Sequence, residues 1–526
     1  MSVSSQAGTS IAKPQSTSLL QSLTNHPIGF WFIFWGEFAE RCSYYGMRAI
    51  LVSYMMDQLG MGPKAAGTYY SFFIAGCYLL PLVGGFIADN YLGKYKTIVF
   101  FSVPYVLGHV VLGIENLPCL FIALAMLAMG SGVTKPNIST LMGLTYDQKR
   151  PGDDELRTTA FSLFYMAINI GAALSQIGIP WVRTNYGYQM AFLFPAALMA
   201  VALVIFAAGK RFYAQEVISN VPKTPEDRKL QWQILGRIGS LFLLVTFFWA
   251  IFDQSSSTWI IFGRLYQDTA LFGGHVDVEQ VQATNPILIV LLTPLFAALW
   301  AILRAQGMPV RATDKILAGF LLTGVCMGIM AIPGLKAGPI ETLGVPLGPV
   351  ESQQEATDKI DKELPRVYAG MLGLLGHPLA NAPAVISEIG MPMQNTKLYV
   401  RPENKMTIWW QVLAFLIITV AEILISITGL ELAFVAAPKS MKGFVTSLWL
   451  LTVFLANFGL NAPLAQLYPV MNPGKYFALL SVMMLVVAAV FYFVAKRFNR
   501  LASEQEEINK HEALALAVKR GVPPGD

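Results

Sequence analysis

Apolar segments long enough to cross a lipid bilayer recur along almost the whole chain, and polar or glycine-rich stretches separate them. A transmembrane helix needs about 20 predominantly apolar residues. By this criterion the sequence predicts twelve such helices, in two groups on either side of a basic stretch that begins at Lys210. The first group is 28–57, 66–88, 97–115, 117–143, 158–180 and 187–208. The second group is 239–262, 284–303, 314–334, 407–435, 443–469 and 475–497.

The composition agrees with this pattern. Hydrophobic residues make up 55% of the chain and charged residues only 13%, against about 25% charged residues in ordinary soluble domains. The basic residues gather at the ends of apolar segments and form no basic stripe, which favours a lipid bilayer as partner and no nucleic acid. There is no HExxH, GxSxG, P-loop or CxxC string, so we expect neither an enzyme nor a metal site nor a cofactor.

The distribution of Lys and Arg orients the predicted helices. If the N-terminus lies in the cytosol, the inner connections hold most of the basic residues. The short outer connections then hold Lys64, Arg183, Arg264 and Lys475. This asymmetry satisfies the positive-inside rule and requires an even number of spans, so we expect both termini to be cytoplasmic.

The longest inner connection divides the helices into two sets of six. The predicted parts are a cytosolic N-terminal tail (1–27), an N-terminal six-helix bundle (28–208), a cytosolic linker (209–238), a C-terminal six-helix bundle (239–500) and a cytosolic C-terminal tail (501–526). The C-terminal bundle includes a long periplasmic loop (335–406), in which we expect 367–386 to lie in the membrane interface. The alternative, a further span, would reverse the topology downstream. The polar to amphipathic segment after Arg500 predicts a helix in the tail.

The first predicted helix carries an unusual set of polar side chains. They recur at offsets of 0, 3, 4, 7 and 11, so they fall on one stripe of the helix. They are Glu37, Glu40, Arg41, Tyr44 and Arg48. A charge at the centre of a bilayer costs about 2.5–3.5 kcal/mol, so the stripe must face protein or water, and ionisable groups in a membrane indicate function. A structural ion pair that locks two helices together is the alternative interpretation.

Other predicted spans also hold polar side chains. Asp89, at the end of the second, can pair with a basic residue or a helix N-terminus and latch one conformation. Lys135 precedes Pro136 in the fourth, where polar groups can line a cavity, although snorkelling to the surface is the alternative. For Asn169 in the fifth, substrate contact and helix–helix hydrogen bonding stay equally open. The second half offers Trp249, Asp253, Asn285, Glu422, Ser426 and Trp449.

The two halves differ in the charges that they would present to a cavity between them. The first half supplies cations and acids together, whereas the second half supplies the acids Asp253 and Glu422. A basic wall would then face an acidic one. This polarity suits a zwitterion whose charges lie several ångströms apart, such as a short peptide.

Several of these motifs together resemble the proton-dependent oligopeptide transporter (POT/PTR) family, bacterial type, a branch of the major facilitator superfamily. They are the ExxER string at Glu37 with Tyr44, Tyr45 and Gly46 after it, GGFIADNYLG, Lys135-Pro136, and FSLFYMAINIGA. The resemblance implies an all-α membrane protein with the major facilitator superfamily fold, twelve transmembrane helices in two six-helix bundles. It also implies a cell inner (plasma) membrane as the location.

The resemblance also implies roles for individual residues. The proton-coupling set would be Glu37, Glu40, Arg41 and Lys135. The substrate-binding set would be Arg48, Tyr44, Tyr45, Tyr78, Lys135, Asn169, Trp249, Asn285, Glu422, Ser426 and Trp449. In this set Arg48 would bind the peptide carboxylate and Glu422 the amino terminus. Asp253 would close the outer gate against Arg48, and Asp89 joins them as a gating residue.

The function implied is proton-coupled symport that imports di- and tripeptides by alternating access. Its partners would be the peptide, protons and the bilayer, with no obligate protein partner. The nearest rival is a carrier of the same fold for another solute, such as nitrate, a drug or an amino acid derivative. Glu422 argues against a plain anion, because a carboxylate in the cavity would repel it. A membrane enzyme or receptor, or a peptide sensor, is the rival from another class.

Overall fold

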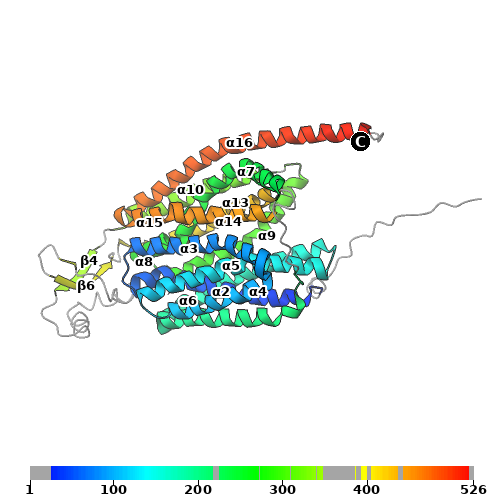
Figure 1. Cartoon of the computed structure of the whole chain (residues 1–526). Helices are drawn as coiled ribbons and strands as arrows, with labels where there is room; N and C mark the ends of the chain where they lie inside the picture. The colour runs from blue at the N-terminus through cyan, green and yellow to red at the C-terminus, as the bar shows by residue number, and fades with distance from the viewer. Residues whose placement is uncertain are drawn as a thin grey trace, which may run out of the picture.

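The chain forms a bundle of long helices that lie roughly along one direction (Figure 1). The computed structural model describes residues 25–216, 224–271, 273–308, 310–338, 341–346, 385–386, 392–399, 404–435 and 442–519. Most of the predicted N-terminal tail and most of the interfacial segment predicted at 367–386 lie outside the described residues.

The N-terminal half consists of five helical ranges and two short turns. They are α2 (Ile28–Asp57), α3 (Pro63–Ile87) with the π-turn η1 (Ala88–Leu92), α4 (Lys94–Leu112), α5 (Leu117–Lys149), α6 (Asp154–Ala208) and η2 (Lys210–Phe212). α6 would be about 80 Å long if it were straight, far more than the roughly 30 Å of a bilayer core. Gly187 has a left-handed backbone (φ 81°) that bends the chain there. α6 is therefore two spans, as predicted.

The C-terminal half is more interrupted. It contains α7 (Pro225–Phe252), η3 (Asp253–Ser256), α8 (Thr258–Tyr266), η4 (Val278–Ala283), α9 (Thr284–Ala305), α10 (Ala312–Lys336), α13 (Trp409–Val435), α14 (Lys442–Leu455), the π-turn η7 (Ala456–Asn461), α15 (Ala462–Leu467), η8 (Tyr468–Val470) and α16 (Pro473–Lys519). The predicted seventh and eleventh spans are thus each broken in the middle, at η3 and at η7.

The helices account for the twelve predicted spans. Among the described residues, ten helices are long and apolar enough to cross a membrane. One of these is α6, which supplies two spans. α2 is 30 residues long and begins and ends where the sequence predicted the first span, but it carries the charged stripe. The all-α membrane architecture is therefore confirmed.

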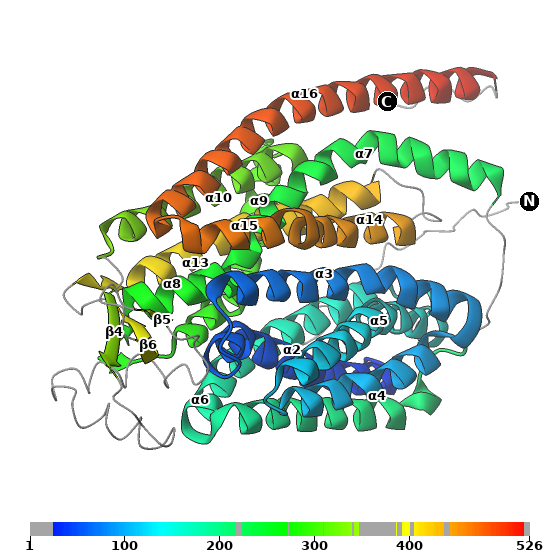
Figure 2. The same cartoon turned by 60° about the vertical axis from the view of Figure 1, so that its left-hand side comes forward.

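Most predicted boundaries lie within a few residues of the observed ones, and the linker and the C-terminal tail differ most from the structure. The predicted linker 209–238 includes the first turns of α7, which begins at Pro225 because proline is favoured in the first turn of a helix. The tail helix predicted after Arg500 is a continuation of α16, which runs unbroken to Lys519. Figure 2 shows this end of α16 at the top of the bundle, above the start of α7.

Small strands lie at one end of the bundle, at the left of Figure 1. β4 (Glu341–Pro346), β6 (Pro392–Tyr399) and β5 (Val385–Ile386) form an antiparallel sheet in the order β4-β6-β5. β1 (Gln267–Asp268) pairs with β7 (Met406–Thr407), and β2 (Ala270–Leu271) pairs with β3 (Gly274–His275). The predicted long loop thus contains a sheet, and the last two residues of the predicted interfacial segment form β5.

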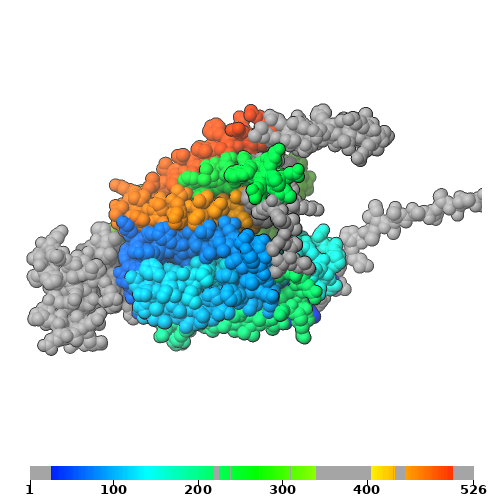
Figure 3. All heavy atoms as spheres, in the orientation of Figure 1, coloured from blue at the N-terminus to red at the C-terminus, as the bar shows by residue number. Residues whose placement is uncertain are grey.

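The two halves meet along a seam at which α3 packs against α14 and α15. Figure 3 shows the blue and cyan surface of the N-terminal half against the orange surface of α14 and α15. Within the N-terminal half, glycines permit close helix contacts. A Cβ at Gly84 of α3 would lie 2.7 Å from Cα of Val133 in α5, and one at Gly130 would lie 2.5 Å from Cγ of Tyr105 in α4. The second contact places Tyr105 beside the charged stripe of α2.

Candidate functional site

The polar stripe of α2 is buried along its whole length. Glu37 and Glu40 are each 2% exposed and Arg48 is 8% exposed. Since a helix rises 1.5 Å per residue, the stripe from Glu37 to Arg48 extends over about 16 Å. The charges therefore face protein and not lipid, as the sequence analysis required.

One guanidinium serves two carboxylates at the beginning of the stripe. Arg41 Nε lies 2.6 Å from Glu37 Oε1 and 2.9 Å from Glu40 Oε2. The hydroxyl of Tyr105, from α4, donates a 2.8 Å hydrogen bond to Glu40 Oε1. With both acids ionised, this cluster carries one net negative charge in a buried site, where an uncompensated charge is costly. A proton or a nearby cation must compensate it.

Lys135 of α5 is the nearby cation. Its ammonium lies 3.7 Å from the ring centre of Tyr44 and 5.5 Å from that of Tyr78. Among the described residues, no carboxylate lies within the 4 Å of an ion pair with it. Lys135 interacts electrostatically with Glu37 and Glu40 over a longer distance. The aromatic faces hold a cation here that a substrate carboxylate or a nearby acid could still attract.

Arg48 joins the two halves. Its Nη2 donates a 2.6 Å hydrogen bond to Asp253 Oδ1 at the start of η3, and its Nε donates a 2.5 Å bond to the hydroxyl of Tyr70 in α3. Asn457 Nδ2 donates a 2.7 Å bond to the other oxygen of Asp253. The ion pair predicted for the gate is therefore formed in this structure.

A network of side-chain amides continues from Asp253 into the C-terminal half. Asn461 donates to Asn457, Gln254 donates to Asn461, and Gln254 Oε1 accepts from Thr258 and from Tyr476 at 2.6 and 2.9 Å. The sequence analysis did not identify this network. The polar string from Gln254 to Thr258 inside an apolar segment was a signal, but the π-turn η7 that turns Asn457 and Asn461 to the same side was not predictable from composition. Such turns are frequent at functional sites.

Glu422 of α13 lies across the seam from α2. Asn285 Nδ2 donates to Glu422 Oε2 at 2.7 Å and to Thr419 Oγ1 at 3.0 Å. Glu422 also interacts electrostatically with Arg48 and with Tyr45. Two residues predicted to bind substrate, Asn285 and Glu422, are thus in direct contact, and they face the α2 stripe from the other half.

Aromatic and hydroxyl groups complete this region. The rings of Trp249 and Trp449 lie 6.3 Å apart at 83°, and Gly429 leaves room for Trp449. Three buried polar atoms there have no hydrogen-bond partner among the described residues. They are Trp249 Nε1, Ser426 Oγ and Tyr44 Oη, the last of which lies close to the thiol of Cys77. Buried donors are normally satisfied, so these atoms are available to a bound ligand.

Two of the predicted residues form hydrogen bonds or ion pairs with residues four or five positions away in the chain. Asn169 donates to the carbonyl of Tyr165, one turn earlier in α6, which corresponds to a local helix contact. Asp89 pairs with Lys94 and its side chain is 65% exposed. Neither contact reaches the C-terminal half.

A second ionic cluster ties the halves together at the end of α2 that finishes with Asp57, which we call the Asp57 end. Both oxygens of Asp57 lie 2.7 Å from Arg264 Nη2 of α8, and Tyr188 donates to Asp57 at 2.8 Å. Glu279 of η4 accepts from Ser53 and lies 3.2 Å from Arg183. The sequence analysis used Arg183 and Arg264 only to orient the helices, because residues so far apart in the chain gave no sign of meeting.

Asp277 belongs to the same cluster. It pairs with Arg183 at 3.2 Å, accepts from Thr184 and caps η4 through a capping box with Gln280. Burial raises the pKa of Asp277, and the charge of Arg183 opposes this shift. The side-chain bonds that join the halves thus gather at Arg48 and towards the Asp57 end.

Comparisons with known proteins show which family this chain resembles. The sequence model described as the POT family matches residues 95–232, 217–346 and 369–479. Human "Solute carrier family 15 member 1" is 31% identical over 378 residues, which cover 59% of this chain and 52% of that protein. The chain thus spans about half the length of this relative. "Peptide transporter 3" of Caenorhabditis elegans is 25% identical over 97% of this chain and 99% of its own.

Solved structures share the fold. The POT family transporter PepTSo superposes with a TM-score of 0.69 and 25% identity, over 90% of this chain and 99% of its own. A peptide transporter POT in complex with sulfate superposes with a TM-score of 0.72 and 23% identity, over 92% of this chain and 97% of its own. The family match over most of the sequence and the shared membrane fold lead to one conclusion: this chain belongs to the POT family of transporters.

Proposed function

We propose that this protein is a proton-coupled symporter that imports di- and tripeptides by alternating access. The observation that carries the proposal is the buried Arg48–Asp253 pair between the halves, with the cluster of Glu37, Glu40 and Arg41 on one side and Glu422 opposite. These groups offer a cationic site for a peptide carboxylate, an anionic site for its amino terminus, and carboxylates that can take up a proton. The relative called a peptide transporter supports the same substrate class.

In the proposed mechanism, protonation of Glu37 or Glu40 makes their cluster with Arg41 neutral, so that Lys135 becomes the uncompensated charge. Lys135 and Arg48 can then hold a substrate carboxylate. A carboxylate on Arg48 competes with Asp253, and this competition would couple binding to opening of the seam. The halves would rock about the site, as in other carriers built from repeated bundles.

We further propose that the Asp57 end faces outward, with both termini in the cytoplasm of a bacterial cell and the protein in its inner membrane. The positive-inside rule supports this orientation. The structure would then represent a state closed to the outside by the Arg48 and Asp57 clusters. We propose no catalytic step, since the polar groups of the site serve binding and proton uptake.

Uptake into proteoliposomes tests this function directly. Labelled dialanine should accumulate when the outside is more acidic than the inside, and unlabelled dialanine but not nitrate should compete. The guanidinium of Arg48 alone would accept either the carboxylate of dialanine or nitrate. Glu422, however, repels an anion that has no amino terminus. Competition by nitrate without competition by dialanine would favour the rival carrier.

Glu422→Gln is expected to reduce the preference for a free amino terminus. Wild-type protein should take up dialanine much better than N-acetyl-dialanine, because only the former presents an ammonium to Glu422. In the variant the ratio of the KM for N-acetyl-dialanine to the KM for dialanine should fall about tenfold or more, since hydrogen bonds to charged groups contribute about 1.5–3 kcal/mol. The measurement is the ratio of the two KM values. The matched control is Glu115→Gln, at an exposed glutamate between α4 and α5; an unchanged ratio in Glu422→Gln would remove this residue from amino-terminus recognition.

Asp57→Asn is expected to favour opening at the Asp57 end. Among the carboxylates of the described residues, Arg264 would keep Glu279, at 3.9 Å, and breaking a buried pair costs about 3–5 kcal/mol. The reporter is a cysteine introduced at Ala49, which is 2% exposed, in a variant without the natural cysteines. This cysteine should react faster with a membrane-impermeant thiol reagent when Asp57→Asn is present than when Asp57 is kept. Asp147→Asn, which breaks the exposed pair with Arg157, should leave the rate unchanged. Equal rates in the two variants would contradict the role of Asp57.

A further inference from the structure

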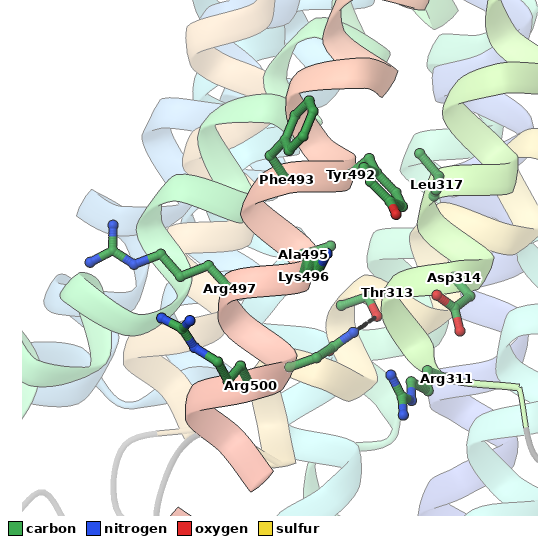
Figure 4. A pocket seen from close by; sticks show the side chains of 11 residues that line it. Arg311, Thr313, Asp314, Leu317, Tyr492, Phe493, Ala495, Lys496, Arg497 and Arg500 are labelled. Atoms are coloured by element: carbon green, nitrogen blue, oxygen red, sulfur yellow. Dashed lines mark hydrogen bonds between the residues drawn. The ribbon is translucent and has the colours of Figure 1, made fainter. Parts of the chain in front are cut away.

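A hollow of about 670 Å³ lies between α10 and α16, and none of the residues that line it belongs to α2 (Figure 4). It lies near the start of α10 and beside the part of α16 that precedes Arg500. Antiparallel packing of the two helices places it at the end of the bundle opposite Asp57. We call it the α10–α16 hollow.

The floor of the hollow is fixed by direct contacts between the two helices. Thr313 and Asn499 exchange hydrogen bonds of 2.9 and 3.2 Å, which appear as the dashed line in Figure 4. Further along, the rings of Phe320 and Phe491 pack edge to face at 4.9 Å. The shape of the hollow therefore depends on packed helices and not on a loop.

The charge of the hollow is strongly positive. Four cations line it, Arg311 from the residue before α10, and Lys496, Arg497 and Arg500 from α16, against one acid, Asp314. Figure 4 shows Arg497 and Arg500 projecting from one side of α16 and Arg311 at the start of α10. Arg311, Lys496 and Arg497 are all exposed. Because Arg497 and Arg500 point away from α10, the cations that flank the gap between the two helices are Arg311 and Lys496. Two such cations can hold an anion with several oxygens, since a guanidinium binds phosphate in a forked geometry.

An apolar aromatic surface adjoins the cations. Tyr492 and Phe493, one turn before Lys496, are 50% and 69% exposed, and Leu317 lies across from them on α10. Aromatic side chains are enriched where a transmembrane helix passes through the membrane–water interface. A ligand of the whole hollow would thus have an anionic head and an apolar body.

We propose that the α10–α16 hollow binds an anionic phospholipid, with the phosphate of the headgroup between Arg311 and Lys496, Arg497 at the rim, and an acyl chain along Tyr492 and Leu317. Basic pockets between transmembrane helices at the cytoplasmic face bind such headgroups. A lipid can contact the aromatic surface with its acyl chain, whereas free phosphate would contact the cations alone. The aromatic surface therefore favours a lipid. The bound lipid would bridge α10 and α16. This proposal does not depend on which solute the protein carries.

Binding can be measured on the full-length protein by native mass spectrometry after equilibration in mixed micelles of dioleoylphosphatidylglycerol and dioleoylphosphatidylcholine. Wild-type protein should retain dioleoylphosphatidylglycerol preferentially. The variant R311Q/K496Q/R497Q should lose this preference by about tenfold or more, because each basic residue near an anionic headgroup contributes about 1 kcal/mol. The charge-retaining variant R311K/K496R/R497K should keep most of it, which separates loss of charge from loss of folding.

The matched control is K96Q/K149Q/R211Q, which removes three exposed positive charges from the N-terminal half. It should retain dioleoylphosphatidylglycerol like the wild type. Equal loss in the control would mean that net charge and not the hollow attracts the lipid, and it would overturn the proposal. Displacement of the lipid by millimolar inorganic phosphate or glycerol 3-phosphate, which lack acyl chains, would overturn the assignment to a lipid.

Discussion

Glu40→Gln should abolish the accumulation of dialanine that a proton gradient drives, while exchange of labelled for unlabelled dialanine at equal pH should continue. A membrane potential of about 100 mV is worth about 2.3 kcal/mol per proton, which corresponds to roughly fifty-fold accumulation of a neutral zwitterion. The glutamine keeps an oxygen that can accept from Tyr105 but takes up no proton. With Glu37 ionised, the cluster with Arg41 is then already neutral before any proton binds, so the transport cycle loses its coupling step.

The measurements are uphill uptake and counterflow in proteoliposomes made from the same preparation. Glu115→Gln, at an exposed residue, is the control for protein handling and should behave like the wild type. Loss of both uptake and exchange in Glu40→Gln would indicate a structural role for this residue. Uphill accumulation at the wild-type level would mean that the coupling proton binds elsewhere.

Arg48→Lys should reduce dialanine uptake by about 100-fold, although the charge is kept. Arg48 uses two different nitrogens, Nε for Tyr70 and Nη2 for Asp253. The single ammonium of lysine cannot reproduce this fork. Lysine therefore loses at least one of the two hydrogen bonds, and a hydrogen bond to a charged group contributes about 1.5–3 kcal/mol. The initial rate of uptake and the KM for dialanine measure the effect.

Two further variants interpret this result. Arg157→Lys changes an exposed ion pair with Asp147 and should leave uptake unchanged. The double variant R48Q/D253N removes both charges, so it should restore the thermal stability lost in Arg48→Lys without restoring uptake. Recovery of uptake in the double variant would show that Arg48 and Asp253 serve only to join the halves and that the substrate carboxylate binds elsewhere.

The polar stripe of α2 shows how far the sequence could go at the site. Helical spacing alone placed Glu37, Glu40 and Arg41 on one face, and the cost of charge in a bilayer required this face to be buried. The spacing made Glu37 and Arg41 neighbours, because residues four positions apart on a helix lie on the same face, but the bond of Arg41 to the adjacent Glu40 did not follow from it. The contact of Tyr105 with Glu40 could not be predicted, since it depends on the packing of α4 against α2 and on the space that Gly130 leaves.

Contacts between helices that are distant in the chain were harder to predict for the same reason. Asp253, Asn285 and Glu422 were recognised as polar residues in apolar segments, but the direct contact of Asn285 with Glu422 was not predicted. The cluster of Asp57 with Arg264 was missed altogether. A sequence shows which residues are costly to expose to lipid, but it does not show which of them are close in space.

The sequence by itself determined the membrane architecture of this protein: the number of spans, nearly all of their boundaries, and the helix that carries the charges. It could do so because length, hydropathy and charge along one segment are local properties, and a bilayer acts on each segment separately. Only the tertiary structure decided which buried groups pair across the seam, where α7 and α14 are interrupted, and where the α10–α16 hollow forms. Those features arise from contacts between residues that are distant in the chain, and their energies depend on how the helices pack against one another.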